Sequence, residues 1–451
     1  MTPGPGAASF LAGHEASASL RHSTGALRWT AALAVVGFVG FTAWYTAQHI
    51  IAATADPEIA VLVSRGNVTT WPRLVQSFTA AAERHGWLVS EAASENPGRL
   101  RIVFGDGGVV LFRLYKELGH GGLRDRVDSL CRRSRPPLAI LSGANSGSAR
   151  VVAEALHEHE GVAPSPLYLL SSGTVDDLAG IHADKTFRFG HKNSRQAKDL
   201  VQRLQRLYAE KGKDPPTVRV AIVQIQDDPF ACEFTHFVRL ELTDALGDAR
   251  VAFDVLKLPT AVGPSNEPTE LERRNAAKLA GEMASAPQQE WVVVMPGASD
   301  FVRRFWLCHY EALQEVGADR MAVHFDNLTY LVGDSIDFVD FNGPLPPSAL
   351  HATAIFFAQY DPRVGSTDSP DSSLIREALY HEIAETVLSV LAIPGARESA
   401  ASLRSALAHY RRTPEGPSYF DGPERRGGGG PVVVRAKLDA KFLFDFPSQM
   451  K

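Results

Sequence analysis

The sequence predicts an α/β protein with two doubly wound parallel-sheet lobes and a cleft between them, preceded by one N-terminal transmembrane helix. From Pro57 onward, short runs rich in Val, Ile and Leu alternate with amphipathic helical patterns. This alternation occurs in two series that join near residues 187–192, which indicates two lobes. Before Pro57, a long apolar segment carries no charge, and this segment predicts the membrane helix.

The predicted strands are continuous apolar runs, as expected when helices cover both faces of a parallel sheet. We place the strands at Pro57–Ser64, Leu100–Phe112 (a strand and hairpin), Pro136–Gly143, Ser165–Gly173, Thr217–Ile225, Ala252–Leu258, Glu290–Gly297 and Arg320–Asn327. The helical patterns between them lie near Pro72–His85, Gly147–His159, Arg195–Lys211, Glu233–Leu246 and Glu270–Ser285.

The N-terminal apolar segment is long enough to cross a membrane. It runs uncharged from Thr30 to Ala47 and continues to Ala55, which meets the requirement of about 20 residues for one crossing. Arg28 precedes the segment and Asp56 follows it. The positive-inside rule therefore places residues 1–28 in the cytoplasm as a short tail, residues 29–55 in the membrane, and the remainder outside.

A cleaved signal peptide is the alternative for the same segment, because Ala53-Thr54-Ala55 has the pattern of a cleavage site. The apolar core is longer than the usual 7–15 residues or so of a signal peptide, and this length favours an uncleaved anchor. Both interpretations export the rest of the chain: to the outer side of a single-pass anchor in the cell membrane, or to the periplasm as a secreted protein.

Composition excludes several classes of partner and cofactor. The net charge of -5 gives no electrostatic reason to expect nucleic acid. The three cysteines lie far apart, so we expect small buried side chains rather than a disulfide framework or a zinc site. His381-Glu382 lacks the second histidine of a zincin helix and predicts a solvated helix face. Asp227-Asp228 favours a helix start over a metal site. No metal, cofactor or catalytic residue is predicted.

Small polar residues lie where a predicted strand passes directly into a helix. The stretch Leu138–Leu156 reads LAILSGANSGSARVVAEAL, which places Asn145 and Ser146 at the start of the helix. Backbone N–H groups and hydroxyls at a helix N-terminus suit a small anion such as the carboxylate of an amino acid. Helix capping alone would also explain these two residues.

Four stretches, in this order along the chain, resemble the type I periplasmic solute-binding proteins, specifically the leucine/isoleucine/valine-binding branch of ABC transporter substrate-binding proteins. They are LAILSGANSGSARVVAEAL, LYLLSSGTVDDLAG, FRFGHKNSRQAKDLVQRL and VRVAIVQIQDDPFACEFTHFVRLEL. In that family a serine loop and a threonine loop of lobe one hold the carboxylate and ammonium groups of an amino acid, and an acid of lobe two neutralises the ammonium.

The resemblance implies ligand-binding residues in this chain. The serine loop falls on Asn145 and Ser146, and the threonine loop falls on Ser172, Gly173 and Thr174. The lobe-two residues are the lid aromatic at Phe230 and the acid at Asp326.

The resemblance also implies the organisation of residues 57–451. Lobe one is expected to comprise residues 57–190 and 357–430, and lobe two residues 191–356 and 431–451. The function it implies is that of an extracytoplasmic, membrane-anchored solute-binding protein, not an enzyme. It would bind an amino acid or a similar small polar ligand by closure of the lobes, for uptake or sensing. The expected partners are that ligand, an ABC permease or membrane receptor, and the bilayer through the N-terminal helix. A protein-interaction module on the same fold, without ligand binding, is the alternative.

Overall fold

The computed structural model describes residues 38, 56–64, 70–93, 98–143, 145–161, 164–212, 217–259, 268–297, 299–316, 327–333, 353–358, 374–415, 418–421, 424–425, 432–437 and 443–445. The chain divides into two compact units, Met1–Asp56 and Pro57–Lys451. The membrane segment predicted at 29–55 lies outside the described residues, apart from Phe38. Within the described part of the chain, no helix combines the length and the apolar character that a membrane crossing requires.

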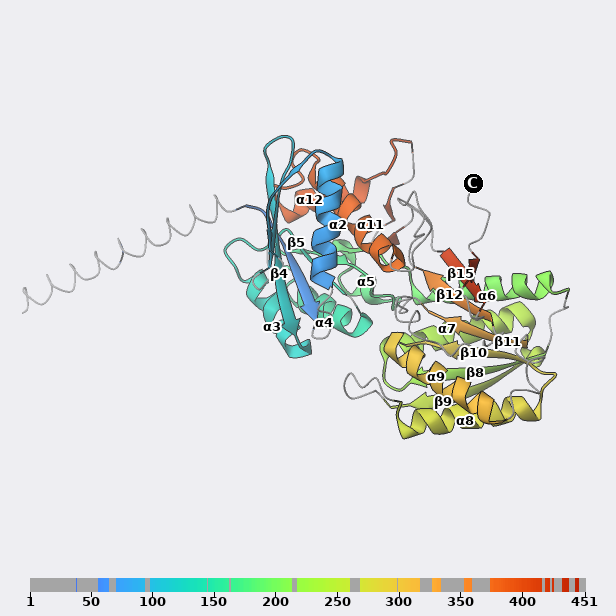
Figure 1. The fold of residues 1–451 in the computed structure, drawn as a ribbon. Coiled ribbons are helices and arrows are strands. Elements are labelled where there is room, and N and C mark those ends of the chain that lie inside the picture. The colour runs from blue at the N-terminus through green and yellow to red at the C-terminus, as the bar shows by residue number, and fades with distance from the viewer. Residues whose placement is uncertain are drawn as a thin grey trace, which may run out of the picture. The chain divides into compact units, whose positions relative to one another are not determined.

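The second unit is built on two seven-stranded sheets (Figure 1). The first sheet has the order β2-β3-β4-β1-β5-β6-β7. Its strands are β1 (Glu58–Ser64), β2 (Leu88–Ala93), β3 (Arg99–Val103), β4 (Val109–Leu118), β5 (Ala139–Ser142), β6 (Leu167–Leu170) and β7 (Thr186–Arg188). The five strands from β4 to β7 pair in parallel, whereas β2, β3 and β4 pair antiparallel.

The second sheet has the order β16-β15-β12-β11-β10-β8-β9. Its parallel strands are β8 (Val218–Ile225), β9 (Val251–Leu258), β10 (Glu290–Met295), β11 (Leu328–Val332) and β12 (Thr353–Ala358). Two antiparallel strands complete it, β15 (Val432–Lys437) and β16 (Leu443–Asp445). A separate pair joins β13 (Phe420–Asp421) to β14 (Glu424–Arg425).

Helices cover both faces of each sheet, because alternate residues of the buried strands point to opposite faces. In β1, Ile59 and Val61 pack with α2 (Thr70–Arg84), α11 (Leu374–Leu391) and α12 (Ala400–His409). Ala60 and Leu62 pack on the other face with α3 (His120–Cys131), α4 (Ser146–Glu158) and α5 (Leu178–Ile181). The chain therefore returns to the first sheet after β12, because α11 and α12 belong to its core.

The second sheet is covered in the same way. One face packs against α8 (Glu270–Ser285) and α9 (Ser299–Glu315), and the other against α6 (Asn193–Glu210) and α7 (Pro229–Leu246). Local sequence sets where these helices begin. Thr269 and Glu272 form a capping box at the start of α8, and Asp228 accepts a hydrogen bond from the backbone N–H of Phe230 at the start of α7. The prediction that Asp227-Asp228 marks a helix start is confirmed.

The two-lobe α/β architecture is confirmed, with differences in detail. The sheets are parallel in their centres and mixed at an edge, where hairpin strands extend them. Residues 320–326 of the strand predicted at Arg320–Asn327 lie outside the described residues, and the strand of this region, β11, begins at Leu328. Cys131 and Cys308 are buried as predicted, whereas the same prediction is wrong for Cys232, which is exposed.

The predicted solvated helix face at His381-Glu382 is wrong at Glu382. This side chain is buried, accepts a hydrogen bond from the Tyr419 hydroxyl at 2.5 Å, and forms an ion pair with Arg412. A buried carboxylate needs such partners. They come from a segment about 30 residues further along the chain, so the helix sequence alone does not predict them.

Candidate functional site at the carboxyl edge of the first sheet

Two neighbouring strands of the first sheet end beside each other. Strands β5 and β6 pair in parallel, and Ser142 lies opposite Leu170 in the register. The loops that follow the strands therefore start at the same edge of the sheet, where doubly wound folds bind ligands. Gly143 turns the first loop with φ of 95°, and a Cβ there would lie 2.5 Å from the Leu170 side chain. Only glycine fits this position.

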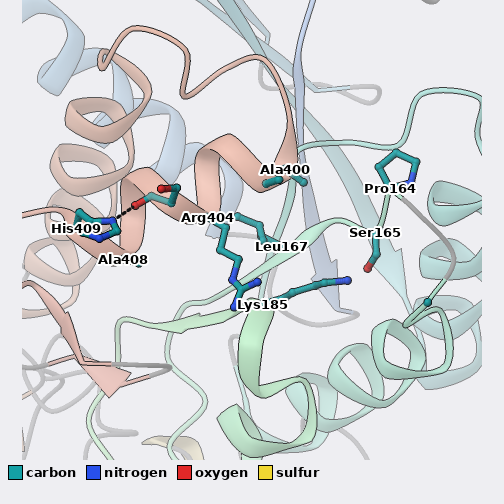
Figure 2. Close-up of a pocket in the computed structure, with 11 residues that line it drawn as sticks. Pro164, Ser165, Leu167, Lys185, Ala400, Arg404, Ala408 and His409 are labelled. Carbon is teal, nitrogen blue, oxygen red and sulfur yellow. Dashed lines mark hydrogen bonds between the residues drawn. The ribbon is translucent and has the colours of Figure 1, made fainter.

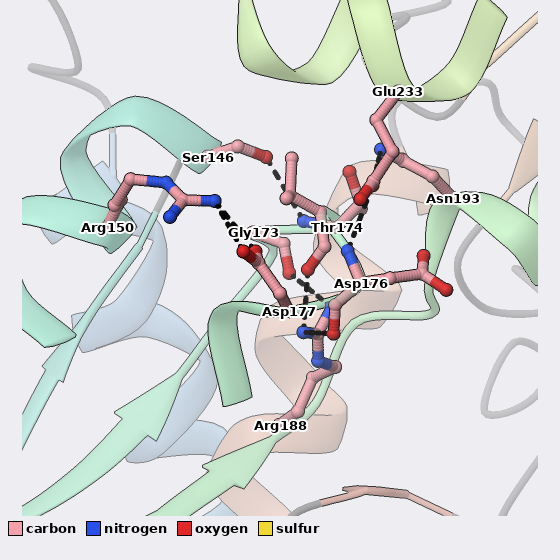
Figure 3. A network of polar contacts seen from close by, with 10 residues as sticks. Ser146, Arg150, Gly173, Thr174, Asp176, Asp177, Arg188, Asn193 and Glu233 are labelled. Carbon is pink, nitrogen blue, oxygen red and sulfur yellow. Dashed lines mark hydrogen bonds and ion pairs between the residues drawn. The ribbon is translucent and has the colours of Figure 1, made fainter. Parts of the chain in front are cut away.

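The two loops bring the predicted lobe-one residues together. Asn145 caps α4, since its Oδ1 accepts a hydrogen bond from the Ser148 N–H at 2.8 Å. The Ser146 Oγ accepts a hydrogen bond from the Thr174 N–H at 3.3 Å, and this bond joins the start of α4 to the loop after β6 (Figure 3). Both Ser146 and Thr174 are buried.

Ser172 and Gly173 complete this loop. The Ser172 hydroxyl donates to the Gly143 carbonyl at 3.3 Å. A Cβ at Gly173 would lie 2.9 Å from the Ala149 Cβ, so glycine allows the loop to approach α4 closely. The five lobe-one residues predicted from the sequence thus occupy one small region, held by hydrogen bonds between its two loops.

Arg188, at the end of β7, holds the loop that follows β6. Sequence analysis missed this residue. The side chain is fully buried. Its guanidinium donates to the carbonyls of Gly173 at 3.1 Å, Val175 at 2.8 Å and Asp176 at 3.2 Å (Figure 3). A guanidinium stays charged in proteins, so the three carbonyls stabilise its charge while it fixes the path of the loop.

The same loop contacts the second lobe. Glu233, on α7, accepts a hydrogen bond from the Asp176 N–H at 2.9 Å and another from the Asn193 side-chain amide at 2.8 Å. Burial raises the pKa of Glu233, although these two hydrogen bonds oppose the shift. The Asp176 carboxylate in turn accepts from the Ser194 hydroxyl at 2.6 Å. Glu233 is therefore a lobe-two carboxylate in direct contact with the candidate site loop.

His120 is a further feature that sequence analysis missed. A Cβ built on Gly147 would lie 3.8 Å from the imidazole of His120. The exposed ring at the first residue of α3 is thus a neighbour of the first turn of α4. The sequence carries no signal for it, because a histidine at the start of a separate helix has no fixed spacing from the serine loop.

Of the two predicted lobe-two residues, only Phe230 lies within the described part of the chain. Phe230 lies at the start of α7, is 8% exposed, and belongs to a core cluster of the second sheet. Its ring stacks on Phe234 with centroids 5.5 Å apart, and it packs against Gly333. Asp326 lies outside the described residues.

A cavity of about 600 Å³ lies elsewhere in the first lobe (Figure 2). Leu167, the first residue of β6, lines it. The cavity therefore lies at the amino end of that strand, whereas the candidate site loops follow the carboxyl ends of β5 and β6. Its walls are mainly apolar with two cations, Lys185 and Arg404. None of the predicted site residues lines it.

Solved structures provide a precedent for this fold, whereas no protein-family model and no curated protein matches the chain. A leucine-binding protein from Thermotoga maritima aligns with a TM-score of 0.56 at 13% identity, covering 86% of this chain and 97% of that one. A solute-binding protein of an ABC transporter from Rhodopseudomonas palustris, in complex with 3,4-dihydroxybenzoic acid, aligns at 0.56 and 12%, covering 87% and 96%. An ABC transporter substrate-binding protein from Desulfitobacterium hafniense, in complex with leucine, aligns at 0.54 and 13%, covering 86% and 100%.

These structural neighbours are substrate-binding proteins of ABC transporters, several of them for branched-chain amino acids, and not enzymes. The fold implied by the sequence resemblance, the two-lobe type I periplasmic binding fold, is therefore confirmed.

Proposed function

We propose that residues 57–451 form an extracytoplasmic solute-binding protein. It binds an amino acid or a similar small carboxylate between its two lobes. The observation that carries this proposal is the meeting of Ser146 and Thr174 at the N-terminus of α4, on the carboxyl edge of the first sheet. Helix N-termini attract anions through their N–H groups and dipole. Leucine and 3,4-dihydroxybenzoic acid, the ligands of two structural neighbours, both carry a carboxylate.

In this proposal the lobe-one loops hold the ligand carboxylate and lend backbone groups to the rest of the head group. Asn145, Ser146, Ser172, Gly173 and Thr174 form this half of the site. The other half comes from lobe two, where the family resemblance assigns Asp326 to the ammonium and Phe230 to the apolar part. Closure of the lobes shifts an equilibrium between open and closed forms.

We also propose where the chain lies in the cell and which proteins it contacts. The apolar segment at 29–55 anchors the chain in the cell membrane, with residues 57–451 on the outer side, or directs its secretion if it is cleaved. The closed form then docks on an ABC permease for uptake or on a membrane receptor for sensing.

A thermal-shift panel tests the binding function. The chain is unfolded and refolded to remove carried-over ligand, and its melting temperature is measured with amino acids, small amides and organic anions. A ligand at about 100 times its Kd stabilises the fold by roughly 2.7 kcal/mol. We expect one carboxylate-bearing class to raise the melting temperature, and the double substitution Ser146→Ala with Asp326→Ala to abolish the rise.

One observation favours the alternative, a protein-interaction module that has lost ligand binding. The Thr174 N–H already donates to the Ser146 Oγ, and Phe230 packs into the core. If a chain that melts cooperatively shows no shift across the panel, the interaction module replaces the binding protein as the proposed function.

A further inference from the structure

Two histidines and a glutamate meet at the C-terminal end of α4, away from the candidate ligand site. His157 lies in the last turn of α4, Glu160 follows the helix, and His182 lies between α5 and the short helix η1 (Ala183–Lys185). The Glu160 carboxylate contacts both rings: one oxygen is 2.5 Å from His182 Nδ1, and the other is 3.0 Å from His157 Nδ1. One ligand atom from each residue lies within 4.8 Å of the other two.

Hydrogen bonds to the backbone of the three residues set where they lie. The Glu160 N–H donates to the His157 carbonyl at 2.9 Å, which sets the turn at the end of α4. The His182 carbonyl accepts from the Thr186 hydroxyl at 2.9 Å. His182 is fully buried, whereas the His157 side chain is 58% exposed. The cluster therefore has a buried inner ligand and a face open to solvent, through which an ion and its water can enter.

Two imidazole nitrogens and one carboxylate are the ligand types that Zn²⁺ takes in proteins, in a site that keeps its fourth position for water. We propose that His157, Glu160 and His182 bind one Zn²⁺ ion through His157 Nδ1, His182 Nδ1 and the Glu160 carboxylate. On binding, the proton between each ring and the carboxylate leaves Nδ1, either to Nε2 of the same ring or to solvent, and the ion takes its place. Neutral imidazole and ionised carboxylate are the forms that ligate metal.

This site is separate from the proposed ligand site. Ser146 and His157 are 11 positions apart on one helix, about 17 Å along its axis. Bound Zn²⁺ ties the end of α4 to the segment before β7, and so fixes the orientation of the helix whose first residue carries the candidate ligand hydroxyl. Zn²⁺ binding and binding of a carboxylate ligand are measured independently.

Zinc titration of the full-length chain tests the proposal. The chain is purified in mild detergent without a histidine tag, stripped with EDTA, freed of the chelator, and titrated with ZnCl₂ in a calorimeter. We expect one Zn²⁺ per chain. Glu160→Gln and His157→Ala should each weaken binding by roughly tenfold or more, because even loss of an outer-sphere partner costs that much.

His159→Ala is the matched control. His159 is next to the cluster in sequence, but its Nε2 pairs with Asp128 at 2.8 Å, so its removal should leave Zn²⁺ affinity unchanged. Co²⁺ provides a second measurement: four-coordinate Co²⁺ gives intense visible absorption, which Glu160→Gln should abolish. Because the His157 side chain is exposed, His157→Ala should fold even if a change at Glu160 does not.

Two results would overturn the proposal. One is the absence of stoichiometric Zn²⁺ binding by the unaltered chain. The other is a loss of affinity in His159→Ala equal to that in His157→Ala, which would indicate general surface binding by histidines.

Discussion

Arg188 in the first lobe and His309 in the second lobe are both buried completely, but their surroundings treat the positive charge in opposite ways. Arg188 of the first lobe is 0% exposed and donates to three backbone carbonyls. His309 on α9 of the second lobe is also 0% exposed, and its Nδ1 has one hydrogen bond, with the Tyr330 hydroxyl at 3.0 Å. Burial lowers the pKa of His309 to about 3.

The comparison shows how local acceptors decide the state of a buried cationic group. Arginine cannot lose its proton, so the first lobe must supply acceptors, and the carbonyls it supplies belong to the loop of the candidate site. Histidine can lose its proton, so the second lobe keeps the ring neutral among aromatic side chains such as Trp306, which stacks on Tyr330. The buried charge of Arg188 therefore positions the loop of the candidate site in the first lobe. The neutral ring of His309 packs in the core of the second lobe.

The largest expected effect is that of Arg188→Met. The substitution keeps an unbranched side chain but removes a donor from the carbonyls of Gly173, Val175 and Asp176, of which Val175 still accepts from the Leu178 N–H at 3.3 Å. Each buried acceptor that is left without a donor costs about 1–3 kcal/mol. Urea unfolding of the variant and the unaltered chain measures the loss in the free energy of unfolding.

Arg150→Ala is the control for that prediction. Arg150 bonds the Asp177 carboxylate at 2.7 Å in the same region, but the two side chains are 35% and 60% exposed. Solvent-exposed ion pairs contribute about 1 kcal/mol or less. If Arg188→Met destabilises the chain no more than Arg150→Ala, the buried guanidinium does not hold the loop.

Arg188 also illustrates what sequence can and cannot predict about the site. The serine loop was predictable because strand, polar loop and helix follow one another within about 20 residues, and the threonine loop was assigned from the family resemblance. The hydrogen bonds from Arg188 go to backbone carbonyls 12 to 15 positions earlier in the chain. Because every residue has a carbonyl, no residue type in the sequence marks these partners. The same holds for Glu233, whose partners Asp176 and Asn193 lie 57 and 40 positions away.

Elements of the fold were likewise predictable where their signal in the sequence is local. Helix α8 and strand β8 follow their predicted ranges closely, because amphipathic period and apolar runs are local signals. Edge strand β2 (Leu88–Ala93, LVSEAA) was missed, since its exposed Leu88 and polar centre give no apolar run. Phe230 was assigned to a lid by resemblance, whereas its contacts with Phe234 and Gly333 depend on how α7 packs against the sheet.

A smaller effect is expected from the titration of His309. The folded protein keeps the ring neutral, whereas the unfolded chain protonates it near pH 6.5. The unfolded state therefore binds the extra proton, and stability falls as the pH drops through 6.5. Between pH 7.5 and pH 5 this group should cost about 2 kcal/mol. Urea unfolding at both pH values measures the change.

His309→Gln separates this contribution from those of other titrating groups. The variant should be less stable at pH 7.5, because the Tyr330 hydroxyl loses its usual partner, but its stability should change less between pH 7.5 and 5, by about 2 kcal/mol. An unchanged pH dependence in His309→Gln would mean that the ring is protonated in the fold, and the contrast with Arg188 would disappear.

The smallest effect on stability, and the sharpest on function, is expected from Ser146→Ala. The lost hydrogen bond to the Thr174 N–H should cost about 1 kcal/mol. Ser171→Ala is the matched control: its hydroxyl donates to the Ser142 carbonyl at 3.0 Å on the same edge of the sheet, and its loss should cost a similar amount. If Ser146 contacts the ligand, only Ser146→Ala weakens binding, by roughly tenfold for each 1.4 kcal/mol of lost contact. Calorimetric titration of both variants with the ligand from the thermal-shift panel measures this difference. Equal affinities in the two variants would mean that Ser146 is a structural residue that joins two loops. Arg188 would then stabilise a loop that does not bind the ligand through Ser146.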